Sequence, residues 1–496
     1  GRIVEARKLF DEMPERNSVC WNAMIGAYTQ SNQIEKAANL FEQMPERDAV
    51  TWTTIVNGYA SIGEIEKGVE LVNRYSKEKS MADLALISGF VRCSKMDQAR
   101  NLFDKITTHD VVCWNTMITG YASSGRMEEA HHLFDLMKNK DGVAWNTMII
   151  GYGSVGNMAK SQKLFHEMKE KNHITWNSLI TGFMVNDMYI EALKSFASML
   201  HEGYKPDQIS YTCGLCSSAC LAALKVGEQM HSLVLKTGYG KDLTVRNTLI
   251  SMYSKNGRIS SAEEIFREKL ERDVISWNSL ISGYALNGLG NQAIKLFEEM
   301  VSKGLEPDGV TFVAVLSACR HAGLVDQGLR VFKSMVEIHR VDPMVEHYSC
   351  LIDLLGREGR VLEALDVVKR MRVKASAGVW GSLLGCCRVH SNNGVDAVFL
   401  AKKLSGFEPD KASSNVLLAN INAESEKWKE VEEVRDSVER AKKERGLSRV
   451  EINNLMIEFG CGDKPLLESS GGLRMVNCLT AQIKTIQCNN TDFLPL

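Results

Sequence analysis

The chain has 496 residues, of which 44% are hydrophobic and 24% charged, a composition typical of a folded protein. Its 59 basic and 61 acidic residues give a net charge of −2, which excludes a protein that binds mainly through phosphate contacts, because such proteins are basic overall. No apolar run reaches the ~18 residues of a membrane span. The 13 cysteines fall at core-like positions, so we expect reduced thiols rather than a disulfide framework.

The N-terminal residues 1–17 have the pattern of the second half of a helical hairpin. The chain therefore begins inside a helix (IVEARKLFDEM) and without an initiator methionine. We expect its natural N-terminus to be missing, so that no targeting peptide is present to be read.

Tryptophan marks an internal repeat. Five tryptophans are separated by 31, 62, 31 and 31 residues, where 62 is twice 31: Trp21, Trp52, Trp114, Trp145 and Trp176. The skipped slot holds Asp83. Later slots hold Tyr211, Arg246, Trp277, Phe312, Tyr348 and Trp380. A period of this length predicts an array of stacked units rather than a globular protein with one core.

The unit at residues 111–141 shows what each copy is. Trp114, Met117, Ile118 and Tyr121 share one face of a first helix, and Gly125 marks a turn. A second helix repeats the spacing with Ala130, Leu133, Phe134 and Met137. A hairpin of this size cannot bury both apolar stripes alone, so the pattern predicts an all-α solenoid of helix-turn-helix repeats of 31–36 residues.

The repeat boundaries follow from the period. After the truncated repeat at 1–17, an array of eleven units at 18–376 is expected: 18–48, 49–79, 80–110, 111–141, 142–172, 173–207, 208–242, 243–273, 274–308, 309–344 and 345–376. Two hairpins in which the repeat pattern is weaker follow at 377–446. The second is rich in charged residues, which is typical of a helix face exposed to solvent. Helical periodicity fails after residue 447. VEINNLMIEF there resembles a strand, and the tail at 447–496 is expected to be degenerate and poorly ordered.

Two polar positions recur once per unit. The residue after the aromatic slot lies about 100° around the helix, off the core stripe. It is Asn22, Thr53, Leu84, Asn115, Asn146, Asn177, Thr212, Asn247, Asn278 and Val313. The units end in Asp48, Lys79, Asp110, Asp141, Asn172, Asp207, Asp242, Asp273 and Asp308. An amide can donate to and accept from a base edge, so the pairs suggest a ladder that reads bases. The alternative is that Asn and Asp cap helices.

The repeated motif VxWNxMIxGY with EAxxLFxxMxxxD, at spacings of 31, 35 and 36, resembles the pentatricopeptide repeat family of plant organelles. The mixture of long, variant and short units at 173–376 resembles its PLS subclass, and 377–446 resembles the E-type extension of that subclass. The resemblance implies a right-handed superhelical α-solenoid that binds single-stranded RNA, one base per repeat. It implies a monomer with no cofactor and no membrane contact.

The family's two-residue code can be carried onto matching positions. It assigns U to Asn–Asp pairs, C to Asn146/Asn172 and G to Thr212/Asp242. Thr53/Lys79 and Leu84/Asp110 depart from the code. The implied site is 5′-U-N-N-U-C-U-G-U-U. The base-coding residues are Asn22, Asp48, Asn115, Asp141, Asn146, Asn172, Asn177, Asp207, Thr212, Asp242, Asn247, Asp273, Asn278 and Asp308.

Apolar residues three before each coding slot would sandwich the bases by the same resemblance. They are Val19, Val50, Met81, Val112, Val143, Ile174, Ile209 and Ile275. Each also has a plain packing explanation.

The sequence lacks the motifs of the catalytic sites considered for such a chain. Zinc deaminases need H-x-E and P-C-x-x-C, yet none of the 11 histidines is followed by x-Glu. The pair Cys213 and Cys216 lies inside a repeat's first helix, where core packing is the better explanation than a metal. Gly151, Gly153 and Gly156 form a G-x-G-x-x-G that falls in a hairpin, not in a βαβ unit. We expect no catalytic residue and no metal site.

The resemblance implies a site-recognition factor for C-to-U editing in a mitochondrion or, alternatively, a chloroplast. Residues 377–446 would recruit a deaminase-domain protein or another editing factor. The alternatives are a factor for transcript stabilisation, splicing or translation, and a protein-interaction scaffold or decayed gene product.

Overall fold

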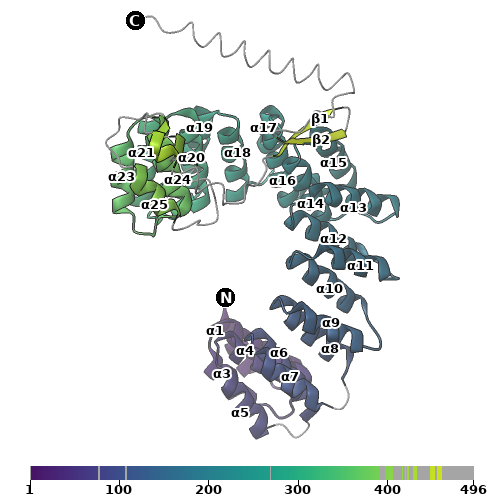
Figure 1. Ribbon diagram of the computed structural model, residues 1–496. Coiled ribbons are helices and arrows are strands. Elements are labelled where there is room, and N and C mark those ends of the chain that lie inside the picture. The colour runs from purple at the N-terminus through teal and green to yellow at the C-terminus, as the bar shows by residue number, and fades with distance from the viewer. Residues whose placement is uncertain are drawn as a thin grey trace, which may run out of the picture. The chain divides into compact units, whose positions relative to one another are not determined.

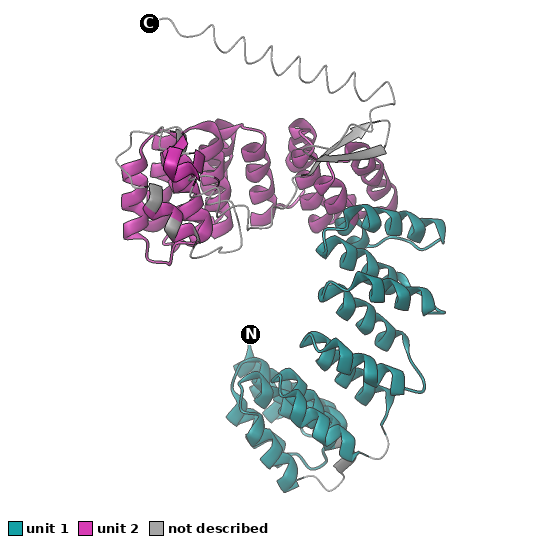
Figure 2. Ribbon diagram, viewed as in Figure 1, with its two compact units in different colours: residues 1–213 teal, residues 214–496 magenta. Residues whose placement is uncertain are grey.

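The computed structural model describes residues 2–75, 79–106, 109–268, 270–389 and 397–405, together with short stretches between 416 and 460. The chain divides into two compact units, Gly1–Cys213 and Gly214–Leu496 (Figure 2). Each unit is a stack of helical hairpins.

The first compact unit consists of paired helices, in which even numbers are the first helix of a repeat and odd numbers the second (Figure 1). The elements are α1 (Ile3–Glu12), α2 (Ser18–Gln30), α3 (Ile34–Gln43), α4 (Ala49–Ser61), α5 (Ile65–Tyr75), α6 (Lys79–Arg92), α7 (Met96–Lys105), α8 (Val111–Ser123), α9 (Met127–Leu136), α10 (Gly142–Ser154), α11 (Met158–Glu167), α12 (His173–Val185), α13 (Tyr189–His201) and the beginning of α14 (Gln208–Cys220). Each first helix packs on its own second helix and on the first helix of the next repeat.

The second compact unit continues the pattern through α25. Its elements are α15 (Leu224–Thr237), η1 (Tyr239–Lys241), α16 (Leu243–Lys255), α17 (Ile259–Arg267), α18 (Val274–Leu286), α19 (Gly290–Ser302), α20 (Gly309–Ala322), α21 (Val325–Glu337), α22 (Val345–Arg357), α23 (Val361–Arg370), α24 (Ala377–Val389) and α25 (Ala397–Ser405). First helices begin where the sequence period starts each unit, except that α6 begins at Lys79, one residue early.

Two short strands lie near the C-terminus, where the segment VEINNLMIEF resembles a strand in the sequence. β1 (Leu447–Ile452) pairs antiparallel with β2 (Leu455–Gly460), so that Leu447 lies opposite Gly460 and Ile452 opposite Leu455. Alternating Leu, Ile and Val residues favour strands over helices, which explains why helical periodicity fails there. Residues 461–496 lie outside the described part of the chain.

A left-handed residue ends the first helix of every complete repeat. Gly125 has φ +74°, and the same slot one period away in other repeats also has positive φ. The residues in this slot are Asn32, Gly63, Ser94, Gly125, Gly156, Asp187, Ala222, Gly257, Gly288, Gly323 and Gly359. Glycine suits the position because a side chain is strained at positive φ.

The core between repeats is organised around an aromatic pair. At six junctions the Phe of a second helix packs edge-on against the Trp of the following first helix, with ring centroids 4.7–5.0 Å apart, as in Phe41–Trp52 and Phe165–Trp176. Trp277 is 1% exposed, whereas Trp114 and Trp145 are only partly buried. Edge-to-face aromatic pairs stabilise the folded chain by more than the burial of their apolar area alone.

In several repeats, a basic residue just after the second helix donates hydrogen bonds to the last carbonyls of that helix. Arg47 donates to the carbonyls of Phe41 and Glu42 at 3.1 and 3.0 Å, and its guanidinium lies 4.8 Å from the Phe41 ring centroid. Its charge therefore meets both the negative end of the helix and an aromatic face. The same slot holds Arg16, Lys140, Lys171 and Arg272.

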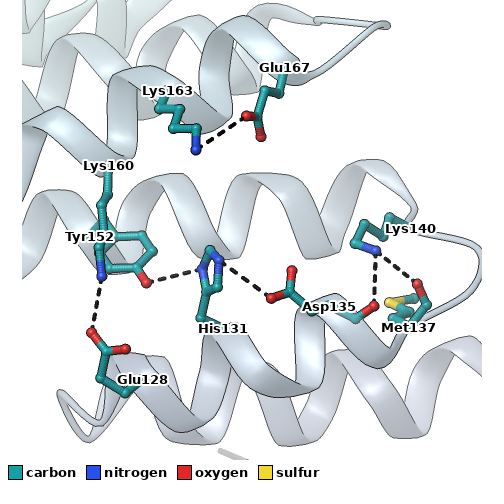
Figure 3. Close-up of polar contacts among 9 residues, drawn as sticks. All are labelled: Glu128, His131, Asp135, Met137, Lys140, Tyr152, Lys160, Lys163 and Glu167. Atoms are coloured by element: carbon teal, nitrogen blue, oxygen red, sulfur yellow. Dashed lines mark hydrogen bonds and ion pairs between the residues drawn. The ribbon is translucent and has the colours of Figure 1, made fainter.

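Polar contacts also tie neighbouring repeats on the side of the second helices (Figure 3). The Tyr152 hydroxyl of α10 lies 3.0 Å from Nδ1 of His131 on α9, and Lys160 of α11 pairs with Glu128 of α9 at 3.0 Å. Lys140 is seen there reaching the carbonyl of Met137. Exposed ion pairs of this kind contribute little to stability, so the aromatic pairs dominate the interface.

Candidate nucleic-acid interface

The recurring Asn and Asp residues meet at each junction between repeats. The side-chain amide of Asn177 on α12 lies 2.9 and 2.8 Å from the two carboxylate oxygens of Asp207, which precedes α14. The same Asn-to-Asp bond occurs in Asn22–Asp48, Asn115–Asp141, Asn247–Asp273 and Asn278–Asp308, at 2.9–3.2 Å. The structure thus brings together five of the residue pairs that the sequence singled out.

The terminal Asp or Asn also caps the next first helix. Asp207 accepts the Ser210 N–H at 3.0 Å, and Asp308 accepts the Thr311 N–H at 2.8 Å. Caps of the same form are made by Asp48, Asp110, Asp141, Asn172, Asp242 and Asp273. The capping explanation therefore holds for the terminal residue. It does not hold for the Asn residues, which lie inside their helices and face the following cap.

These contacts fix the charge of the carboxylates. Burial by itself would raise the pKa of Asp207, but hydrogen bonds from the Ser210 N–H, the Asn177 amide and the Ser210 hydroxyl outweigh it and lower the pKa below 3.8. The same balance lowers the pKa of Asp48, Asp273 and Asp308. These groups are therefore anionic acceptors at neutral pH.

The Asn side chains are less exposed than their position off the core stripe suggests. Asn177 is 6% exposed and Asn278 is 7% exposed, because the next repeat's cap covers them. A buried amide must use its hydrogen-bonding groups, and the amide nitrogens of Asn22 and Asn177 lie within hydrogen-bonding distance of both carboxylate oxygens of their Asp. Because an amide nitrogen carries two N–H groups, an amide that gives one of them to the Asp has a second to offer.

Two predicted pairs differ from the others. The structure gives no hydrogen bond between Asn146 and Asn172, because Asn172 offers one acceptor oxygen and that oxygen already takes the Thr175 N–H and hydroxyl. Thr212 donates to the carbonyl of Gln208 in its own helix at 2.7 Å. Asp242 caps α16 through the Val245 N–H.

The predicted sandwiching residues lie on the surface and not in the core. Their exposed fractions range from 48% for Ile174 to 70% for Val19. The others are Val50, Val112, Val143, Ile209 and Ile275. Plain core packing does not account for them. The Met81 side chain lies outside the described residues.

Two pockets combine these features. One, of about 460 Å³, is lined by Asn177 and Asp207 together with Ile174 and Ile209, and it is floored by residues of α10 such as Gly153. A second, of about 300 Å³, repeats this arrangement. Its wall contains Asn278, Asp308, Ile275 and Val310, and Lys255 lies at its edge. Each pocket therefore offers a polar edge and two aliphatic side chains from successive first helices.

Sequence reasoning missed two sets of residues here. Val310, 60% exposed, occupies the sandwiching slot of the next repeat and could have been found from the period alone. The hydroxyls of Thr51, Ser210 and Ser276 contact the recurring amides, and no sequence signal separated them from ordinary capping residues.

The other candidate motifs lie in helices. Cys213 is buried within α14, and Gly151 and Gly153 lie within α10, where a Cβ on Gly153 would come within 3.2 Å of the Gly182 Cα. Within the described ranges, no group of three or more His, Cys, Asp or Glu side chains could hold a metal. None of the helices described above has the length and apolarity needed to cross a membrane.

Family models match along most of the array. The model of the PPR repeat matches residues 1–18, 19–48, 50–79, 84–111, 143–173, 245–274, 310–339 and 346–374. The model of the PPR repeat family matches residues 109–142, 171–217 and 272–321.

Curated relatives and a solved structure show the same similarity. A putative pentatricopeptide repeat-containing protein of Arabidopsis thaliana is 36% identical over 306 residues, covering 61% of this chain and 44% of the relative. The chloroplastic protein CRR2 of that plant is 39% identical over 293 residues, covering 57% and 44%. The chain thus spans less than half the length of these relatives. The crystal structure of PPR10 from maize aligns with a TM-score of 0.60 at 19% identity, covering 88% of this chain and 66% of that one.

Proposed function

Because the chain belongs to the pentatricopeptide repeat family, we propose that it is a sequence-reading, single-stranded RNA-binding protein of a plant organelle. The observation that carries the proposal is the repeated pocket in which an Asn–Asp pair lies beside two exposed aliphatic side chains. Relatives that carry chloroplastic and mitochondrial names support an organellar location.

The pocket chemistry suits an unpaired base. The aliphatic side chains of Ile174 and Ile209 would present apolar surface to the two faces of a ring, while the Asn177 amide and the Asp207 carboxylate form the polar edge. Bases inside a duplex could not enter such a pocket. A net charge of −2 agrees with affinity that comes from base contacts more than from phosphate contacts.

The five Asn–Asp pairs, Asn146/Asn172 and Thr212/Asp242 would together read 5′-U-N-N-U-C-U-G-U-U. Position four of uracil is a carbonyl, which accepts from an amide N–H. The Asn146/Asn172 pair lacks the carboxylate of the other pairs, in keeping with its assignment to a different base. The repeats at 49–79 and 80–110 carry Thr53 and Leu84 in the reading slot and leave their bases open.

For the finer role we propose site recognition in C-to-U editing. The array would select the transcript, and residues 377–446, which include α24 and α25, would recruit a deaminase-domain protein in trans. The resemblance of 377–446 to an E-type extension supports this assignment. The chain itself would carry out no reaction, because its sequence lacks the H-x-E motif of the zinc deaminases.

RNA binding by the purified chain tests the first proposal. At one fixed salt concentration, affinity for U-N-N-U-C-U-G-U-U is expected to exceed affinity for the same RNA with its coded U and C bases changed to A. Asn278→Ala should weaken the preferred complex and leave the other almost unchanged. Equal, weak binding to both RNAs would instead favour a protein-interaction scaffold.

Sequencing of organellar transcripts tests the editing role. In plants with the gene disrupted, one or a few cytidines downstream of a matching sequence should remain unconverted while transcript levels stay normal. Loss of a transcript or of its splicing, with editing intact, would favour the stabilisation or splicing role.

A further inference from the structure

The amide oxygen of the recurring Asn differs between repeats in what it contacts. In three repeats it lies within hydrogen-bonding distance of the hydroxyl of the third residue of the following repeat: Thr51 to Asn22 at 2.8 Å, Ser210 to Asn177 at 2.5 Å, and Ser276 to Asn247 at 2.7 Å. The same hydroxyls lie 2.8–3.0 Å from the capping carboxylates of Asp48, Asp207 and Asp273, so each can donate its one proton to either oxygen. The amide nitrogen of each of these residues meanwhile donates to the terminal Asp. In these three amides both the nitrogen and the oxygen therefore have a partner within the protein.

Other repeats leave the same oxygen without a partner. The amide oxygen of Asn115 is buried and unpaired, and the third residue of the next repeat is Ala144, which has no hydroxyl. The amide oxygen of Asn278 is also buried and unpaired, because the Thr311 hydroxyl donates to Asp308 at 2.8 Å instead. These amides are held by the carboxylate alone.

We propose that the third residue of each repeat is a positioning residue for base choice in the preceding repeat. Its hydroxyl occupies the amide oxygen, so that the Asn can offer a base only its remaining N–H. The inference rests on the proposed function of the pockets and concerns how sharply they select among pyrimidines.

The chemical consequence concerns uracil and cytosine. Uracil has an accepting carbonyl at position four, whereas cytosine has a donating amino group there. An amide locked as a donor pairs with the first and opposes the second. An amide whose oxygen has no protein partner is free to rotate, which would bring that oxygen, buried in the structure, to the base edge. There it would accept the cytosine amino group, so such an amide would discriminate less. The repeats of Asn22, Asn177 and Asn247 should therefore select U over C more strongly than the repeat of Asn115.

Ser276→Ala is the direct test, measured with the full chain on the nine-base RNA. The ratio of affinities for U over C at the eighth base, read by Asn247 and Asp273, should fall about two- to tenfold, the equivalent of one hydrogen bond. The ratio at the other coded bases should not change. Ser276→Thr should preserve the ratio, because Thr51 makes the same contact in its own repeat.

Thr311→Ala is the matched control. It removes the same capping hydroxyl, from Asp308, but this hydroxyl does not contact an amide oxygen. It should lower the melting temperature about as much as Ser276→Ala does, yet leave the U-over-C ratio at the ninth base unchanged. Equal losses of selectivity in both variants would show that loosened caps are responsible, and would overturn the inference.

Ala144→Ser is the reverse test. Met137 stands seven residues before Ala144 as Met44 stands before Thr51, whose hydroxyl lies 3.7 Å from the Met44 sulfur. The U-over-C ratio at the fourth base should rise by a similar factor. Unchanged ratios in both Ser276→Ala and Ala144→Ser, with U still preferred in the parent chain, would overturn this inference alone. No preference for U at any coded base would overturn the proposed function and this inference with it.

Discussion

The amide nitrogen of Asn177 bonds to both carboxylate oxygens of Asp207, a residue thirty positions further along the chain that ends the same repeat and caps the first helix of the next. The Asp207 carboxylate thus both caps a helix and forms part of a candidate base-reading site. The two roles can be separated by substitution, because Asn177 takes part only in the second.

Asn177→Ala is expected to weaken binding of the coded RNA by an amount equivalent to about 1–3 kcal/mol, through loss of the N–H at the base edge. Asp207→Ala should weaken binding too and should also cost roughly 1 kcal/mol of folding stability through the lost cap. Calorimetric or fluorescence titration and thermal melting measure the two effects.

Asp110→Ala provides the control. Asp110 caps α8 through the Cys113 N–H, but the reading slot of its repeat holds Leu84. Stability should fall while RNA affinity is retained. A loss of affinity equal to that of Asp207→Ala would mean that caps, and not reading pairs, govern binding.

Ala222→Gly is expected to stabilise the chain by about 0.5–1 kcal/mol, because Ala222 is held at φ +54° where glycine is unstrained. Gly125→Ala should do the opposite by a similar amount. A Cβ on Gly125 would meet nothing within 4 Å, so the backbone conformation alone is tested. Urea unfolding measures both, and effects of the same sign would contradict the explanation.

Arg272→Ala should cost roughly 1–2 kcal/mol of stability. Its guanidinium donates to the carbonyls of Phe266 and Glu268 and lies 4.8 Å from the Phe266 ring centroid. Arg272→Lys should retain much of that amount, because Lys171 occupies the same slot over Phe165. A lysine variant as unstable as the alanine variant would show that the paired guanidinium donors, and not the charge, matter.

Acid should destabilise the junctions between repeats. The folded pKa values of Asp48, Asp207, Asp273 and Asp308 lie below 3.8, their unperturbed value. A lowered folded pKa contributes stability that is complete above the unfolded pKa and is lost as the pH falls through the folded pKa. Unfolding free energies measured above and below pH 3.8 should therefore drop in acid.

Asp273→Asn keeps a capping oxygen without a titrating group. The difference in stability between the parent chain and this variant should shrink as the pH falls below 3.8, the unperturbed value for Asp273. Parallel pH profiles would contradict a role for this carboxylate.

The sequence predicts the helical pairs and their boundaries well, because the apolar stripes and turn residues recur in phase. It places Met117, Ile118 and Tyr121 in the core, where the structure has them. It does not show that Trp114 is partly exposed, because that depends on the neighbouring repeat. Nor does it distinguish the Ser276 hydroxyl, which reaches an amide, from the Thr311 hydroxyl, which does not. Both are hydroxyls at equivalent positions, and only the three-dimensional packing separates them.

The terminal residue of each repeat both caps the next helix and contributes to the candidate reading site. These two roles restrict the substitutions by which evolution or design could change the base that a repeat selects. Asp, Asn, Ser and Thr all cap helices, so exchanges among them can alter the selected base while the following helix still begins properly. Lysine cannot cap in this way. Substitutions at the terminal position of a repeat are thus restricted to side chains that can also cap a helix.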